Sequence, residues 1–168
     1  DTTLQLRDSG ALDVTHVIDV HPHGEEIRRG LFFELPEHVG PLGDFAVTLN
    51  GEPIEPEFDD GAIVVAAQQS LALHQTHRFE VRYHAVSPWW LESRLSARLR
   101  WDPIIQQFEL AWRQASLRIH WPESGPIPEL PADGTTEANS WTRMLRGPLH
   151  GEGADESVER LELRTDAS

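Results

Sequence analysis

Two histidines separated by one residue are the clearest candidates for metal chemistry in this sequence. His21 and His23 lie in a His-Pro-His-Gly segment, and on a strand they would share one face about 7 Å apart. Together with a carboxylate such as Glu25 they could bind a metal ion. A closed metal site needs three or four ligands, however, and no other pair has ligand spacing. The sequence therefore favours solvated turn histidines, and it predicts no metal or other cofactor.

The motifs of common hydrolases are absent from the sequence. It contains no G-x-S-x-G, no H-E-x-x-H and no phosphate-binding loop. Some of its 28 acidic residues will be paired by chance, but a glycosidase requires two facing carboxylates at a defined separation. The sequence predicts a domain that is not an enzyme. A metal-dependent hydrolase that uses His21 and His23 is the less favoured alternative.

Two adjacent tryptophans suggest a different kind of site. Trp89 and Trp90 follow Pro88 in a break between two strand patterns. Exposed indole rings stack on sugar faces and also cover other apolar surfaces. A carbohydrate- or lipid-binding site at this pair is therefore a second hypothesis, and packing beneath the sheet is its alternative. Trp101 and Trp121 alternate with polar residues and are expected in the core.

Charge is unevenly distributed along the chain. All 14 basic residues are arginines, and the 28 acids give a net charge of −14, which argues against binding to nucleic acid. Residues 34–60 hold eight acids and no arginine, whereas residues 82–118 hold six arginines and three acids. The sequence thus contains a basic segment inside an acidic protein.

The basic segment supports two interpretations. Arg98, Arg100 and Arg118 are expected on outward faces, where they could meet anionic headgroups or an acidic partner. Alternatively, these arginines and Arg94 form pairs with the acids of residues 34–60 across neighbouring strands, and each pair contributes little to stability. The second interpretation is slightly favoured.

Short alternating runs between glycines and prolines must position these candidates. Nine to eleven strands are expected, which predicts an all-β fold, specifically an antiparallel β-sandwich of two packed sheets. At 168 residues the chain suits a single domain, residues 1–168, whose last part, residues 123–168, is rich in loops. The clearest strand patterns occur at residues 2–7, 12–20, 27–35, 45–49, 62–66, 76–86, 95–101, 117–121, 139–145 and 158–164. Residues 52–58 suggest an edge strand or an extended loop, and residues 71–73 suggest a short strand or a connector.

The stretch from Asp13 to Pro36 predicts a β-hairpin, because two strand patterns flank a polar turn. His16 lies in the apolar register of the first strand and is expected to be a hydrogen-bonded core histidine. Asn50-Gly51 and Asp60-Gly61 are further hairpin signals.

The second strand of this stretch contains two adjacent arginines. Gly30 follows them and suggests a β-bulge. Arg29 shares the register of Ile27 and Leu31, so it is expected to be more buried than Arg28.

The segment Gly24-Glu-Glu-Ile-Arg-Arg-Gly-Leu-Phe32, followed by Pro36, resembles the signature of the YciQ-like predicted bacterial membrane proteins, a family of unknown function. The likeness continues through residues 47–53, 79–83 and 115–122, so it covers about residues 2–122. The resemblance implies an extracytoplasmic β-sandwich, periplasmic or at the cell surface, in an inner-membrane protein whose membrane segments lie outside this chain. It implies no catalytic residue.

The predicted function is therefore that of a non-enzymatic extracytoplasmic domain that binds an unknown protein partner or envelope component. The candidate binding residues are Arg28, Arg29, Trp89, Trp90, Arg98, Arg100 and Arg118.

Overall fold

The computed structural model describes residues 1–23, 30–34, 42–59, 62–66, 70–86, 90–91, 96–101, 112–123, 128–149 and 161–166. All regular structure in these segments is β-strand, which confirms the all-β prediction. The fourteen strands exceed the expected nine to eleven, because strands of two or three residues are too short to produce a periodic pattern.

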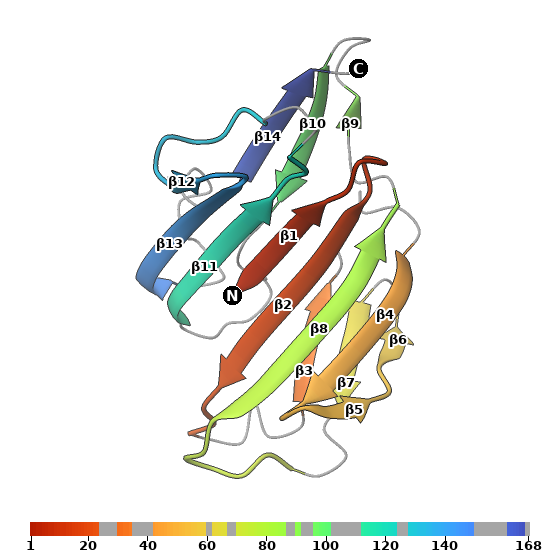
Figure 1. Cartoon of the computed structure of the whole chain (residues 1–168). Coiled ribbons are helices and arrows are strands. Elements are labelled where there is room, and N and C mark those ends of the chain that lie inside the picture. The colour runs from red at the N-terminus through yellow and green to blue at the C-terminus, as the bar shows by residue number, and fades with distance from the viewer. Residues whose placement is uncertain are drawn as a thin grey trace.

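Eight strands form one large sheet. They are β1 (Thr2–Leu6), β2 (Leu12–Val20), β4 (Leu42–Leu49), β5 (Glu52–Ile54), β8 (His77–Ala85), β11 (Trp112–His120), β12 (Thr135–Glu137) and β13 (Ser140–Leu149). Their order across the sheet is β12-β13-β11-β1-β2-β8-β4-β5 (Figure 1). Neighbouring strands are antiparallel except β1 and β11, which run parallel. The expectation of a purely antiparallel arrangement is wrong at this pair, because side-chain alternation does not fix the direction of a partner strand that arrives through a long connection.

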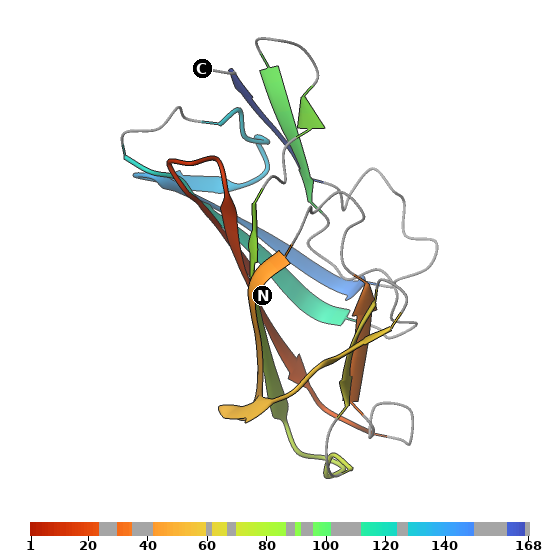
Figure 2. The ribbon, with the colours of Figure 1, turned by 90° about the vertical axis from the view of Figure 1, so that its right-hand side faces the viewer.

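Two three-stranded sheets complete the described fold. One contains β3 (Gly30–Glu34), β7 (Ala62–Ala66) and β6 (Glu57–Asp59), and the other contains β14 (Leu161–Asp166), β10 (Ser96–Trp101) and β9 (Trp90–Leu91), each in this order. The strands β3, β6 and β7 lie behind the large sheet in Figure 1, and Figure 2 shows them on one side of it. We call this side of the large sheet its inner face and the opposite side its outer face. The expected sandwich of two packed sheets is not confirmed, because the strands fall into one large and two small sheets.

The core lies on the inner face of the large sheet. In β2 and β8, every second side chain is buried, and the two strands pair over nine residues from Leu12 opposite Ala85 to Val20 opposite His77. Leu31 of β3 belongs to the same core cluster, so the small sheet contributes to it. The largest fully buried side chains are Trp141, Phe79, Leu4, Leu12, Leu117 and Ile119.

A two-residue turn connects two strands where the sequence indicated it. Asn50 and Gly51 have positive φ angles of 53° and 88° and connect β4 to β5, with Leu49 opposite Glu52. Asp59 pairs with Ala62, and the turn expected at Asp60-Gly61 lies outside the described residues. Residues 52–58 are two short strands in different sheets rather than one edge strand, and residues 71–73 are a connector.

The expected hairpin from Asp13 to Pro36 is wrong. β2 pairs with β1 and β8, whereas β3 pairs with β7 in a separate sheet. Both strand patterns were recognisable, but alternation predicts strands and not their partners. Gly30 has a φ of 126°, which favours glycine. The register between β3 and β7 is nevertheless regular from Gly30 onward, so the expected bulge does not interrupt this pair.

Candidate functional site

The outer face of the large sheet is polar. It carries the residues that alternate with the core positions in β1, β2, β8 and β11, and these include arginines, carboxylates and threonines. Figure 1 looks onto this face, and none of the described strands lies over it. The face is therefore accessible in the part of the chain that the structure describes.

One ionic cluster on the outer face joins three polar side chains, which come from the residue after β1, from β2 and from β8. The Arg7 Nε donates to Asp13 Oδ2 at 2.6 Å, and Nδ1 of His84 lies 2.7 Å from Asp13 Oδ1. Partial burial acts to raise the pKa of Asp13, but the hydrogen bonds from His84 and Arg7 outweigh it and hold this pKa below its ordinary value. The carboxylate of Asp13 is therefore fully engaged within the protein.

Two further arginines of the outer face also have carboxylate partners. Arg78 binds Asp19 through two hydrogen bonds of 2.7 and 2.8 Å, which lower the pKa of that carboxyl group. The Nε of Arg82 donates to Glu80 at 2.6 Å. Exposed pairs of this kind contribute at most about 1 kcal/mol each. Their main effect is to neutralise charge on the outer face.

Arg118 differs from these arginines. It lies on β11 between Thr3 of β1 and Thr142 of β13, and its Nε donates a long hydrogen bond of 3.4 Å to the Thr142 hydroxyl. Among the residues that the structure describes, no carboxylate forms an ion pair with Arg118. Burial and the charge of Arg118 together lower the pKa of the neighbouring His120.

The strand register places Arg118 in a line of polar side chains that crosses the sheet. We call this line the threonine–arginine row. Its members, from β12 to β8, are Thr135, Thr142, Arg118, Thr3, Thr15 and Arg82. The row presents hydroxyl groups on both sides of an arginine that has no described carboxylate partner.

The predicted arginines do not belong to one sheet. Arg98 and Arg100 lie in β10, which belongs to a different sheet from Arg118. The alternative, pairing with acids of residues 34–60 on neighbouring strands, is wrong for Arg98, Arg100 and Arg118, because β10 neighbours β9 and β14 while β11 neighbours β1 and β13. Arg94 lies outside the described residues, so its pairing stays a prediction. The sequence pattern identified these strands but gave no information on which sheet each would join.

Most of the other candidate residues lie outside the described residues. Arg28, Arg29 and Trp89 belong to segments that the structure does not describe, as does Glu25. Trp90 lies at the start of the two-residue strand β9. The expected burial of Arg29 and the expected binding site at the tryptophan pair therefore stay predictions.

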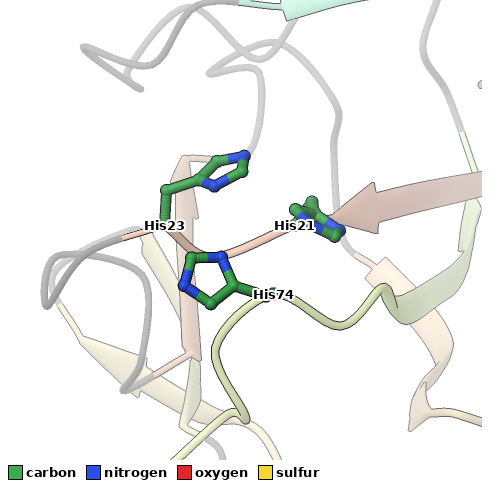
Figure 3. Close-up of side chains that lie close together, drawn as sticks. All are labelled: His21, His23 and His74. Carbon is green, nitrogen blue, oxygen red and sulfur yellow. The ribbon is translucent and has the colours of Figure 1, made fainter.

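A third histidine joins the two that the sequence indicated (Figure 3). His21 and His23 follow the end of β2, and His74 lies in the turn before β8; all three side chains are exposed. The ring centroids of His21 and His23 are 4.8 Å apart, and those of His23 and His74 are 5.6 Å apart. One nitrogen of each ring lies within 4.8 Å of the corresponding nitrogens of the other two. We call these three residues the histidine cluster.

The pairing of β2 with β8 explains how the histidine cluster forms. Val20 lies opposite His77, and continuing this antiparallel register beyond the ladder places His23 opposite His74. The backbone N–H of His74 donates to the Pro22 carbonyl at 2.9 Å and holds the two segments together. Sequence analysis missed His74 because spacing along the chain reveals only ligands that are close in sequence. The matched alternation of β2 and β8 was the signal that could have found it.

His16 is the buried, hydrogen-bonded histidine that the sequence predicted. Its Nδ1 lies 2.9 Å from the Thr2 hydroxyl, and its Nε2 lies 3.2 Å from the Tyr83 hydroxyl. Burial lowers the pKa of His16 to about 3 and raises the pKa of Tyr83. The neutral ring satisfies both neighbours with one donor and one acceptor, so this group stabilises the core.

The fold is shared with part of a larger protein of known structure. A crystal structure of an aminopeptidase N family protein from Idiomarina loihiensis matches with a TM-score of 0.57 and 12% sequence identity. The match covers 97% of this chain and 28% of that chain, so this chain spans less than a third of its length. No curated protein matches the chain.

Comparison of the sequence with known families identifies the family of this chain. The family described as "Predicted membrane protein (DUF2207) N-terminal domain" matches residues 1–166, and the chain belongs to this family. This match confirms the resemblance to YciQ-like predicted membrane proteins of unknown function. Within the described residues, none of the secondary structure is a helix long and apolar enough to span a bilayer.

Proposed function

We propose that this chain is a non-enzymatic, extracytoplasmic domain of a membrane-anchored protein and that it binds a protein partner through the outer face of the large sheet. Membership in a family of predicted membrane proteins supports the anchorage, which we assign to segments outside this chain. The likeness to an aminopeptidase N family protein supports no catalytic role, because at 12% identity it concerns the fold alone. The sequence also has no H-E-x-x-H motif.

The outer face carries this proposal because it is large enough for a stable interface. Eight strands spaced about 4.8 Å apart give a width of roughly 34 Å, and their average length of seven residues corresponds to about 23 Å. The resulting area of about 800 Å² matches the roughly 800 Å² that each partner contributes to a typical protein complex. A folded partner therefore fits on this face.

The charges of the outer face favour a protein over a lipid surface. Attraction to an anionic bilayer needs several basic residues, each contributing about 1 kcal/mol. Among the outer-face arginines whose side chains the structure describes, Arg118 alone lacks a carboxylate partner. A single carboxylate of a protein partner would complete the hydrogen bonding of its guanidinium group. The net charge of −14 does not prevent this contact, since charges farther than about 8 Å are screened.

Replacing Arg118 with glutamate is expected to abolish partner binding without unfolding the domain. In the full-length membrane protein, a photo-crosslinking residue at Thr3, beside Arg118, should form a product with one specific protein. The same residue at Ala132, in an exposed loop, serves as the control position. With Arg118→Glu, we expect the yield at Thr3 to fall about tenfold or more. The introduced glutamate would repel the partner's carboxylate, which Arg118 attracts in the unmodified protein. The free energy of unfolding should change by less than about 0.5 kcal/mol.

Two results would contradict the proposed interface. One is an equal yield of the same product from Thr3 and Ala132, and the other is a yield at Thr3 that Arg118→Glu leaves unchanged.

The location of the domain can be tested separately. In the full-length gene, alkaline phosphatase fused after Ser168 is expected to be active, because this enzyme becomes active only outside the cytoplasm. A green fluorescent protein fused at the same position should then be dark after export through the general secretion pathway. An inactive phosphatase together with a fluorescent fusion would place the domain in the cytoplasm and refute its extracytoplasmic location.

A further inference from the structure

We propose that His21, His23 and His74 bind one divalent transition-metal ion of the Zn²⁺ type through their imidazole nitrogens, with solvent in the remaining coordination positions (Figure 3). This site shares no residue with the threonine–arginine row, so it is independent of the proposed partner interface.

The distances within the histidine cluster are close to those of a metal site. Nitrogens bound to a tetrahedral zinc ion at 2.0–2.1 Å lie about 3.4 Å from one another. The three ligand nitrogens already lie within 4.8 Å of one another. All three side chains are exposed, so rotation about their side-chain bonds can bring the nitrogens closer without displacing core residues. Binding therefore needs no rearrangement of the fold.

The backbone also holds the ligands close together before any ion binds. Pro22 is buried between His21 and His23, so it anchors the segment while both rings face solvent. His74 has a φ of 59°, a left-handed conformation that is uncommon for residues other than glycine. Its N–H is bound to the Pro22 carbonyl at 2.9 Å. A strained residue that presents a ligand is typical of functional sites.

The ligand set selects the class of metal. Three neutral imidazoles suit Zn²⁺, Cu²⁺, Ni²⁺ and Co²⁺, whereas Mg²⁺ and Ca²⁺ require oxygen ligands. The chain has no cysteine, so a thiolate does not complete the site. The neighbouring His77 is buried and already engaged, since its Nε2 donates to the Ala72 carbonyl at 3.0 Å. Three protein ligands at an exposed position leave room for water or for a group from another molecule.

A bound ion would connect two segments that are distant in sequence. His21 and His23 follow β2, and His74 precedes β8, so the ion would hold together the segments at this end of β2 and β8. An ion that binds only the folded state also raises the melting temperature. Metal binding can therefore be measured through the melting temperature, without an assay of any activity.

Titration of the protein with zinc tests the site. The protein must carry no polyhistidine tag and must first be treated with EDTA and dialysed. Calorimetry is expected to detect one Zn²⁺ per chain, and Co²⁺ should give visible absorption bands that Zn²⁺ removes. His74→Asn should weaken binding at least tenfold, because it removes one imidazole while asparagine tolerates a positive φ. His23→Gln should have a similar effect.

His120→Ala is the matched control, because it removes a histidine from β11, which lies outside the cluster. Its zinc affinity is expected to equal that of the unmodified protein. Melting temperatures in EDTA show whether each variant is folded. The proposed site is refuted if folded His74→Asn and His23→Gln bind Zn²⁺ as tightly as the unmodified protein. It is equally refuted if His120→Ala weakens binding to the same extent, or if millimolar Zn²⁺ gives no heat and Co²⁺ gives no absorption.

Discussion

Acidification from pH 7 to pH 4 is expected to lower the free energy of unfolding by about 3 kcal/mol through His16 alone. Burial lowers the pKa of this histidine to about 3 in the folded protein. The unfolded chain takes up a proton near pH 6.5, whereas the folded protein does so only near pH 3. Between these values the unfolded state binds more protons, so stability is complete above pH 6.5 and is lost as the pH falls.

Urea unfolding at pH 7, 5.5 and 4 measures this effect. His16→Gln is the control, because glutamine can still bind the Thr2 and Tyr83 hydroxyls but does not titrate. Asp13 and Asp19 also have lowered pKa values, but both carboxylates are present in His16→Gln as well, so their contribution is the same in the two proteins. If stability falls equally with pH in the two proteins, His16 is not the origin of the loss.

Gly134→Ala is expected to destabilise the protein by about 3 kcal/mol, at the upper end of typical overpacking costs. A Cβ atom at this position would overlap the indole ring of Trp141. Trp141 is 1% exposed, and its Nε1 donates to the Pro131 carbonyl at 3.2 Å. The ring would have to move away and lose both its packing and this hydrogen bond.

Gly43→Ala provides the matched control, because a Cβ atom there would contact nothing within 4 Å. Its stability should stay within about 0.5 kcal/mol of the unmodified protein. Thermal unfolding followed by tryptophan fluorescence measures both variants. Equal melting temperatures for Gly134→Ala and Gly43→Ala would contradict the close packing of residue 134 on the indole ring.

Strands were predictable where one face is buried and the other is solvated. β2 begins and ends at the expected residues, because its alternation of apolar and polar side chains is nearly complete. His16 was recognisable as a core residue for the same reason. The turn at Asn50 and Gly51 was recognisable because both residues tolerate a positive φ. These features depend on residues that are close in sequence.

Partners of strands were not predictable, because pairing depends on residues that are far apart in sequence. The pattern of β3 gives no sign that it pairs with β7 instead of β2. The short strands β5, β6, β9 and β12 contain too few residues for a period to be visible. The same limit applies to strand direction, as the parallel pair of β1 and β11 shows.

Only some of the residues in each candidate site were predictable from the sequence. His21 and His23 were identified from their spacing, and Arg118 was identified from the concentration of arginines around it. The third histidine, His74, depends on the register between β2 and β8. Similarly, the absence of a described carboxylate partner for Arg118 depends on its threonine neighbours, which come from distant strands. A site whose parts come from different strands becomes recognisable only once the strand order is known.

The central position of β1 has a consequence for the order in which the chain folds. One edge of β1 pairs with β2 after a short turn, whereas the other edge must wait for β11, where Thr2 meets Leu117. During synthesis β1, β2, β4 and β8 can therefore assemble first and leave an open strand edge. Such an edge pairs readily with other chains, and long-range pairing is slow. The arrival of β11 covers the open edge of β1, and β13 then covers the far edge of β11.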